Sequence, residues 1–256
     1  MSFDTKGVGF SRLDGKVIVN CGAGNPPAEG HGIGASTSIV CARLGAKVVS
    51  VSNEQLNADT VTQAIKDEGN EGVAFCGDVR KAEEVERLVK FALDTYGRVD
   101  CLVNSGVHNA QMNGFGKITE ESWKDAIDTN LHAHFQLVHQ FLPVFEEQGS
   151  GNILHFTTIA GTVGLGVGKQ RHPYAAGKAA AAVLTKRVGA EYASKNIRAN
   201  VIEIGYCSGP LVNRAVAAGT RSFSLVDAVL NCSSHKPCLL FVFVFALQQA
   251  EPTLTR

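Results

Sequence analysis

Short apolar runs alternate with helix-like segments along most of the chain, and this alternation constrains the fold more than any other feature. Each run is rich in β-branched or other apolar residues, as buried strands are. The six runs are residues 16–19, 47–51, 72–76, 101–104, 151–156 and 198–203. Continuous apolar strands joined by helices are typical of a parallel sheet covered on both faces. The pattern predicts an α/β domain with a doubly wound parallel sheet, whose ligands bind at the carboxyl ends of the strands.

Apolar side chains at helical spacing fill the intervals between these runs. The clearest stripe comprises Val85, Leu88, Val89, Ala92, Leu93 and Tyr96. We predict helices over residues 34–44, 85–96, 123–145 and 174–194, and one more that ends at Gly69. The 256 residues suit one domain, and no repeat or linker divides them.

Composition narrows the classes of function. The 24 Lys and Arg residues balance 24 Asp and Glu residues, which argues against nucleic-acid or membrane partners. Residues 1–10 lack the apolar run of a signal peptide, and the longest apolar stretch, residues 238–247, is about half of a membrane span. The seven cysteines form no C-x-x-C pair, so we expect reduced thiols, a cytoplasmic location, and no disulfide frame or metal site.

A glycine-rich turn follows the first predicted strand and extends from Cys21 to Gly34. Glycines allow a backbone to approach a pyrophosphate closely, and the helix that begins after the turn would direct its N-terminus at that anion. A glycine-rich loop without a ligand is the alternative. The position of the turn between the first strand and the first helix favours a nucleotide.

Tyr174 and Lys178 are four residues apart and therefore share one face of a predicted helix. A phenol with a pKa near 10 is a poor base at neutral pH, and a nearby ammonium would lower that pKa. A tyrosine tuned in this way can exchange a proton with an alcohol oxygen. The alternative is an ordinary surface pair.

These motifs, taken in order, resemble the single-domain branch of the short-chain dehydrogenase/reductase family over roughly residues 13–211. The matching residues are Gly22, Gly32, Gly34, Asp78-Val79, Asn104-Ser105-Gly106, Asn130, Thr158 to Gly161, Tyr174 and Lys178. The resemblance implies a single Rossmann-type domain in three α/β/α layers. It also implies an NAD(P)-dependent oxidoreductase acting on a secondary alcohol or ketone, assembled as a homodimer or homotetramer.

The resemblance assigns roles to individual residues. Tyr174 would be the general acid/base, Lys178 would lower its pKa and hold the nicotinamide ribose, Thr158 would bond the substrate oxygen, and Asn130 would hold a water. The coenzyme-binding positions would be Gly22, His31, Gly32, Ile33, Gly34, Ser52, Asn53, Asp78, Val79, Asn104, Ser105, Gly106, Tyr174, Lys178 and Gly205. Between NADP and NAD we favour NADP, because Ser52 and Asn53 put no carboxylate at the end of the second strand and His31 is basic.

Several features depart from the family pattern. Nine residues separate Gly22 from Gly32, Ile204-Gly205 replaces a Pro-Gly pair, and Gly209 stands where a threonine would touch the nicotinamide amide. These changes leave open a second hypothesis, a nucleotide-binding protein of this fold that is weakly active or inactive and acts in regulation or assembly. Residues 162–173 form a lengthened, glycine-rich segment, either a substrate-facing loop or a passive insertion.

The tail beyond residue 212 lacks the family's closing motif. Residues 239–245 are β-branched and aromatic, so we predict a last parallel strand there, preceded by a helix over 222–230. The alternative is a tail that does not dock on the sheet. We interpret His132, His134 and His139 as ordinary helix residues and His155 as a buried histidine with satisfied hydrogen bonds.

Overall fold

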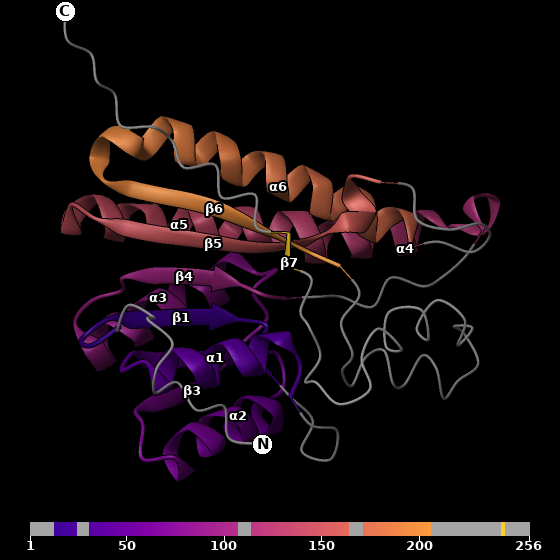
Figure 1. The fold of residues 1–256 in the computed structure, drawn as a ribbon. Coiled ribbons are helices and arrows are strands. Elements are labelled where there is room, and N and C mark those ends of the chain that lie inside the picture. Colours follow the sequence, from indigo (N-terminus) through magenta and orange to yellow (C-terminus); the bar gives the residue numbers. More distant parts are fainter. Residues whose placement is uncertain (1–12, 25–30, 107–113, 164–170, 206–241, 244–256) are drawn as a thin grey trace, which may run out of the picture.

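The computed structural model describes residues 13–24, 31–106, 114–163, 171–205 and 242–243. Its sheet has the strand order β3-β2-β1-β4-β5-β6-β7, in which the first six strands run parallel (Figure 1). The parallel strands are β1 (Val17–Cys21), β2 (Lys47–Ser52), β3 (Gly72–Cys76), β4 (Cys101–Asn104), β5 (Gly151–Thr158) and β6 (Ile197–Ile204). The predicted doubly wound α/β fold is confirmed.

The helices begin and end close to the predicted boundaries. They are α1 (Ile33–Arg43), α2 (Gln55–Asp67), α3 (Ala82–Tyr96), α4 (Glu120–Ile127), α5 (Ala133–Gln148) and α6 (His172–Tyr192). Short turns of 3₁₀-helix occur at Phe115–Lys117, Ile159–Gly161 and Ala193–Lys195. Left-handed glycines at the C-terminal ends explain two of the boundaries, because Gly97 after α3 and Gly149 after α5 have φ values of +74° and +67°.

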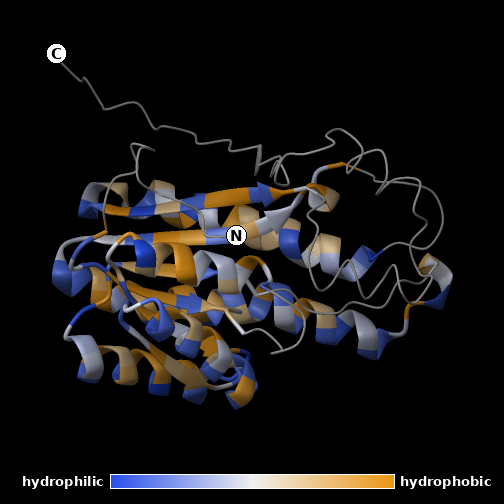
Figure 2. Ribbon diagram, turned by 60° about the horizontal axis from the view of Figure 1, so that its bottom comes forward, coloured by the Kyte–Doolittle hydropathy of each residue, from blue (hydrophilic) through white to orange (hydrophobic). Residues whose placement is uncertain are grey.

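Two hydrophobic clusters cover the two faces of the sheet. One joins strand residues to α3, α5 and α6 through Leu88, Phe141 and Val188. The other joins the opposite face to α1 and α2 through Ile39 and Ile65. Hydrophobic residues accordingly follow the strands and the inward sides of the helices (Figure 2). All five residues of β1 are buried, as expected for a central strand with helices on both faces.

The helix predicted over residues 123–145 is interrupted by a π-helical turn at Asp128–His132, which lies between α4 and α5. Asn130 is buried within this turn, and its side-chain amide donates to the Ala126 carbonyl at 2.9 Å. Gly177 of α6 lies against it, since a Cβ at this glycine would come within 3.1 Å of the Asn130 Cβ. Such turns are frequent at functional sites.

The end of the chain corrects one prediction. Val242–Phe243 forms β7, which pairs antiparallel with β6 through Ile204↔Val242 and Glu203↔Phe243. The prediction of a parallel strand over residues 239–245 is therefore wrong in direction. An apolar β-branched run carries the tendency to pair, whereas the direction depends on how the chain returns to the sheet. The predicted helix over 222–230 and the other residues of the predicted strand lie outside the described residues.

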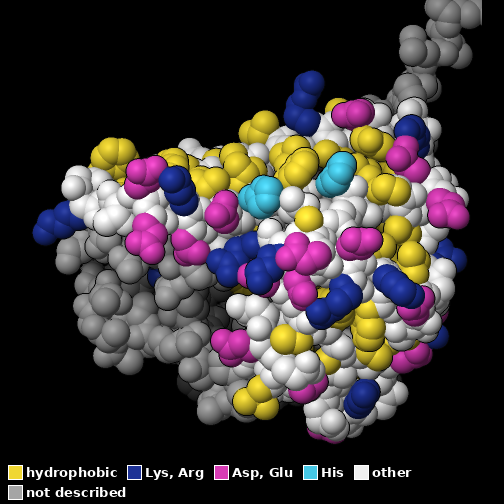
Figure 3. All heavy atoms as spheres, turned by 180° about the vertical axis from the view of Figure 1, so that it is seen from behind, with side chains coloured by type: hydrophobic (Ala, Val, Ile, Leu, Met, Phe, Trp, Pro, Cys, Tyr) yellow, Lys and Arg dark blue, Asp and Glu magenta, His cyan; other side chains and the backbone are white. Residues whose placement is uncertain are grey.

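Charged side chains of both signs are interspersed over the face shown in Figure 3. Several form surface pairs, such as Arg80 with Asp78 at 2.7 Å and Lys90 with Asp94 at 2.6 Å. This distribution agrees with the balanced charge of the sequence. No helix among the described residues is long and apolar enough to cross a bilayer.

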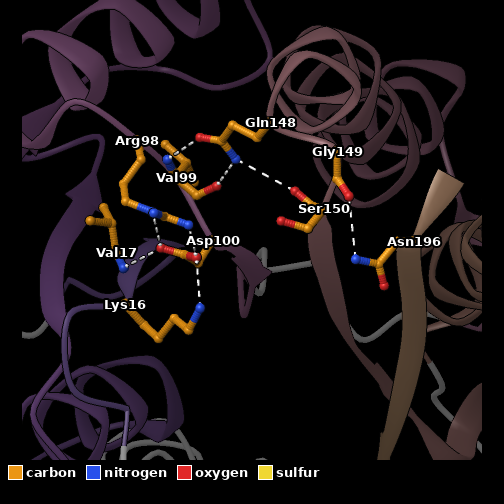
Figure 4. Close-up of polar contacts among 9 residues, drawn as sticks. All are labelled: Lys16, Val17, Arg98, Val99, Asp100, Gln148, Gly149, Ser150 and Asn196. Atoms are coloured by element: carbon orange, nitrogen blue, oxygen red, sulfur yellow. Dashed lines mark hydrogen bonds and ion pairs between the residues drawn. The ribbon is translucent and has the colours of Figure 1, made fainter.

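A polar cluster ties the strands together at the edge of the sheet where β1 and β4 begin (Figure 4). The Asp100 carboxylate accepts hydrogen bonds from the Val17 amide at 3.0 Å, from Lys16 Nζ at 3.1 Å, and from both Arg98 nitrogens at 2.7 and 2.9 Å. Burial alone would raise the pKa of Asp100, but these hydrogen bonds outweigh it and hold the pKa below its usual range. The cluster therefore joins the starts of β1 and β4 at the end of the sheet opposite the predicted ligand site.

We expect Asp100→Asn to lower the free energy of unfolding at pH 7 by about 1.5–3 kcal/mol, the range for hydrogen bonds to a charged group. Because the folded pKa is depressed, the carboxylate's contribution is present above the unfolded pKa near 4 and is lost as pH falls through the lower folded pKa. The difference between wild type and variant should therefore shrink in acid. Urea unfolding at pH 7 and pH 3 measures it. The control Asp94→Asn removes an exposed partner of Lys90 and should change stability by less than about 0.5 kcal/mol; equal losses in both variants would contradict this account.

Candidate active site

The predicted site residues meet at the carboxyl ends of β1, β4 and β5, where α1 and α6 also begin. Three contacts between distant segments establish this. Lys178 Nζ of α6 donates to the Gly106 carbonyl after β4 at 2.7 Å. Gly22 after β1 lies against the backbone of Gly106, and Gly34 of α1 lies against Ser105. A doubly wound sheet is expected to bind ligands at this edge.

The turn after β1 is packed so tightly that only glycine fits at two positions. Gly22 has a φ of +83°, and a Cβ there would lie 2.3 Å from the Cα of Gly106. A Cβ at Gly34 would lie 2.1 Å from the carbonyl oxygen of Gly22. The sequence predicted that these glycines permit close approach to a ligand. The structure adds that they also bring the turn after β1 into direct contact with the turn after β4.

The N-terminus of α1 has the properties of an anion site. Gly32 at the N-cap position has no side chain with which to cap the helix, and the first turn of α1 contains no acidic residue. Amide groups at such an end carry partial positive charge and bind phosphate groups. Ile33 begins the helix, so Gly32, Ile33 and Gly34 lie where a pyrophosphate would be bound. The glycine turn and this helix end fit the dinucleotide that the sequence implied, although residues 25–30 lie outside the described residues.

Asn20 is a site residue that sequence reasoning missed. It is buried within β1, and its amide nitrogen donates to the Gly34 carbonyl and to the Ser38 hydroxyl, both at 2.9 Å. Ser105 Oγ donates to the Asn20 carbonyl oxygen at 2.8 Å. Asn20 therefore fixes the start of α1 against the turn after β4. The available signal was a polar side chain directly after the Val-Ile-Val run of β1, because buried amides require partners.

Lys178 is the most deeply buried charged group of the site. Its side chain is 1% exposed, and Nζ donates to the Gly106 carbonyl at 2.7 Å and the Phe156 carbonyl at 2.9 Å. Burial lowers the pKa of Lys178 to about 7. The ammonium is therefore held by the ends of β4 and β5, and its proton is weakly bound for a lysine.

The surroundings of Tyr174 change the pKa of its phenol. Burial raises the pKa of the Tyr174 phenol, and the opposing effects come from a hydrogen bond with Thr158 and from the charge of Arg171. Lys178 is not among these causes, and its ammonium donates to two main-chain carbonyls. The expectation that Lys178 lowers the pKa of Tyr174 stays a prediction. A phenol with a raised pKa stays protonated at neutral pH and can serve as a proton donor.

Thr158 and Asn130 meet α6 from different elements, Thr158 at Tyr174 and Asn130 at Gly177. Thr158 ends β5, and its hydroxyl accepts from the Ala160 amide at 3.3 Å in addition to its bond with Tyr174. Asn130 Oδ1 is buried and has no hydrogen-bond partner among the described residues. A free acceptor of this kind suits a bound water, the role that the resemblance implied.

The remaining predicted coenzyme residues lie farther along the same edge. Ser52 ends β2 and is buried, with Oγ accepting from the Glu54 amide at 3.3 Å, while Asn53 and His31 are exposed. Asp78 follows β3 and is held by Arg80 through hydrogen bonds of 2.7 to 3.0 Å, which lower the pKa of its carboxyl group. Val79 packs against the first core cluster, and Gly205 follows β6.

Two histidines differ from their sequence interpretation. The sequence suggests an ordinary helix residue at position 134, but the His134 side chain is buried and both ring nitrogens have polar partners, Asn104 and Thr185. It suggests a buried histidine with satisfied hydrogen bonds at position 155, but both ring nitrogens of His155 lack a partner among the described residues. Helical spacing shows which face a residue occupies and says nothing about which strand that face meets. No group of three or more His, Cys, Asp or Glu residues within the described ranges could hold a metal ion.

Comparison with known proteins identifies the family. The family model for short chain dehydrogenases matches residues 28–219. The chain belongs to the short-chain dehydrogenase/reductase family. Cyclohexanol dehydrogenase of Acinetobacter sp. (strain SE19) is 32% identical over 206 residues, which cover 79% of this chain and 77% of the relative. A 3-oxoacyl-(acyl-carrier-protein) reductase of Staphylococcus epidermidis is 33% identical over 185 residues, or 72% and 74% of the two chains.

Solved structures of short-chain dehydrogenases agree with this assignment. A short-chain dehydrogenase/reductase from Burkholderia xenovorans superposes with a TM-score of 0.78 at 31% identity, covering 86% of this chain and 82% of the other. A 7α-hydroxysteroid dehydrogenase in complex with NADH and 7-oxo glycochenodeoxycholic acid gives a TM-score of 0.74 at 28% identity, covering 86% and 80%. The family is one of oxidoreductases, which establishes the general class of this protein.

The contact between Gly22 and Gly106 can be tested with a matched pair of alanine variants. Gly22 and Gly69 both have left-handed φ values, +83° and +77°, but nothing lies within 4 Å of a Cβ at Gly69. Gly69→Ala should therefore lower the free energy of unfolding by only the backbone strain, about 1–2 kcal/mol. We expect Gly22→Ala to lose more stability and to bind dinucleotide at least about tenfold more weakly, because the turn must move away from Gly106. Thermal unfolding and fluorescence titration measure both effects; equal behaviour of the two variants would show that the contact is unimportant.

Proposed function

We propose that the protein is an NAD(P)-dependent oxidoreductase that transfers hydride between the nicotinamide and a secondary alcohol or ketone. The observation that carries this proposal is the hydrogen bond of Tyr174 with Thr158 at the end of β5, one helical turn before the Lys178 that binds the Gly106 carbonyl. A carbonyl that accepts hydride needs a proton on its oxygen and a second donor that fixes this oxygen. Tyr174 and Thr158 supply these two groups.

The chemistry of each residue follows from its surroundings. A bound nicotinamide coenzyme would supply the hydride. In reduction, Tyr174 gives its proton to the substrate oxygen as negative charge develops there, while the Thr158 hydroxyl holds that oxygen in place. Lys178 would hold the ribose next to the nicotinamide and keep positive charge near the reacting oxygen. Alcohol oxidation requires the phenolate instead, so its rate should rise with pH.

The names of the relatives support the substrate class. They are a cyclohexanol dehydrogenase, a 3-oxoacyl reductase, and a 7α-hydroxysteroid dehydrogenase bound to NADH and a 7-oxo steroid. These substrates share a hydroxyl or ketone on a secondary carbon and differ widely in the rest of the molecule. We therefore propose a small molecule of this class as the substrate, turned over by a homodimer or homotetramer in the cytoplasm.

A nucleotide-binding protein without turnover is the second candidate. Ile204-Gly205 replaces the Pro-Gly pair of the family, and β6 is followed by an antiparallel rather than a parallel partner. Both features lie at the carboxyl end of β6. Assays of the purified protein with NADPH or NADH and a panel of small ketones distinguish the two candidates.

Tyr174→Phe tests the assignment of the acid/base. We expect turnover to fall by about 100- to 10,000-fold, the usual contribution of general acid/base catalysis, with nucleotide affinity nearly unchanged. Lys178→Ala should impair both turnover and affinity, since Lys178 would contact the coenzyme and also orders the turn at Gly106. Steady-state kinetics and coenzyme titration separate these effects. A Tyr174→Phe variant that retains more than about a tenth of the wild-type rate would refute the assignment.

Coenzyme preference depends on the end of β2. We propose NADP over NAD, because the buried Ser52 and exposed Asn53 place no negative charge beside the ribose 2′ position. Asn53→Asp should weaken NADPH binding by about tenfold, because two like charges would meet near the surface, and should leave NADH binding nearly unchanged. Asn70→Asp adds the same charge at the opposite edge, before β3, and should change neither constant. A wild-type protein that clearly prefers NADH would contradict the proposal.

A further inference from the structure

His134 lies on α5 with its side chain fully buried between the sheet and α6. One ring nitrogen, Nδ1, lies 3.1 Å from the amide nitrogen of Asn104 at the end of β4. The other, Nε2, lies 2.8 Å from the Thr185 hydroxyl of α6. His134 therefore connects α5 and α6 to Asn104, one of the residues of the candidate coenzyme site.

The neighbouring hydrogen bonds determine where the ring carries its proton. Asn104 Oδ1 accepts from the Gly106 amide at 3.1 Å, so the Asn104 nitrogen faces the ring, and that nitrogen can only donate. The Thr185 hydroxyl gives its own hydrogen to the Ala181 carbonyl at 2.8 Å and can therefore accept from the ring. His134 consequently accepts at Nδ1 and donates from Nε2.

Burial keeps this ring neutral. Burial, followed by the charge of Lys178, lowers the pKa of His134 to about 3. The ring of His155 on β5 packs beside it with ring centres 4.1 Å apart, and burial also holds the pKa of His155 well below its usual range. A protonated His134 would lose its acceptor at Nδ1. The neutral form therefore keeps the bond from Asn104 over the whole working range of pH.

Asn104 is in turn connected to Lys178 through the backbone of Gly106. Gly106 is held at its amide by Asn104 Oδ1, and its carbonyl accepts from Lys178 Nζ at 2.7 Å. The same glycine backbone meets Gly22, so its position also sets the glycine turn that would cradle a pyrophosphate. A rotation of the Asn104 side chain would release the Gly106 amide and displace both Lys178 and that turn.

We propose that His134 is a positioning residue. Its Nδ1 orients Asn104, and Asn104, through Gly106, holds Lys178 and the glycine turn after β1 in place. An apolar residue at this position would leave the Asn104 amide buried without an acceptor, which is unfavourable. The proposal rests on the proposed function for its kinetic consequences. The hydrogen-bond geometry that it requires can be measured without any coenzyme.

Two substitutions separate the orienting role from simple packing. In His134→Asn, the side-chain oxygen can occupy the place of Nδ1 and accept from Asn104, while the bond to Thr185 is lost. In His134→Gln, the amide reaches toward Thr185, and the acceptor for Asn104 is lost. Both variants remove the ring and should lower the unfolding temperature similarly, so a packing role predicts equal effects on activity.

We expect His134→Asn to stay within about threefold of wild type in coenzyme dissociation constant and in kcat/KM, and His134→Gln to lose about 5- to 50-fold in both, with the KM of the ketone little changed. The matched controls His139→Asn and His139→Gln alter an exposed histidine of the same helix and should change these constants less than about twofold. Equal losses in the two His134 variants, or a larger loss in His134→Asn, would overturn the proposal.

Nuclear magnetic resonance gives a readout that does not depend on catalysis. The ¹⁵N shifts of the His134 ring should report a neutral, Nε2-protonated imidazole down to about pH 5, and the Gly106 amide should exchange with solvent faster in His134→Gln than in His134→Asn. A proton on Nδ1, or equal exchange in the two variants, would overturn the proposal. If the wild type binds no dinucleotide, the proposed function fails, and these two measurements still decide the role of His134.

Discussion

The buried ammonium of Lys178 is the constraint on which the arrangement of the site depends. An isolated charge in the interior is strongly unfavourable, so Lys178 must find acceptors. The carbonyls of Gly106 and Phe156 provide them. The first lies just beyond the end of β4, where the chain leaves the sheet, and the second lies on β5 near its carboxyl end. Because one side chain of α6 must reach both, the helix is fixed relative to these strands, and Tyr174, one turn earlier, is placed at the same edge.

Glycines, which lack a side chain, allow the backbone segments of the site to pack closely. Gly22 and Gly34 allow the turns after β1 and β4 to touch, and Gly177 allows α6 to approach the π-helical turn that holds Asn130. Close approach of the backbones at these three glycines buries the site and leaves its parts few ways to shift separately. The pKa values of Tyr174 and Lys178 are consequences of this burial, which raises the first and lowers the second.

Buried polar side chains then select one arrangement of these backbones. Asn20 links β1 to the start of α1 and to Ser105, and His134 links α5 to Asn104. Each of these groups would be destabilising if its partner moved, so the networks favour a single geometry over other equally compact ones. The polar cluster around Asp100 does the same at the opposite edge, away from the candidate site (Figure 4).

The sequence alone determined the order of strands and helices, the three-layer fold, the family, and the positions that meet at the carboxyl edge. These depend on local periodicity, on glycine, and on fixed spacings such as that of Tyr174 and Lys178, which the chain carries in any context. Only the tertiary structure decided the antiparallel direction of β7, the raised pKa of Tyr174, the hydrogen-bond partners of Asn20 and His134, and a His155 ring without a partner among the described residues. Each of these depends on which distant segment lies within a few ångströms and on how much water is excluded. Such contacts join residues up to 85 positions apart, and no local pattern records them.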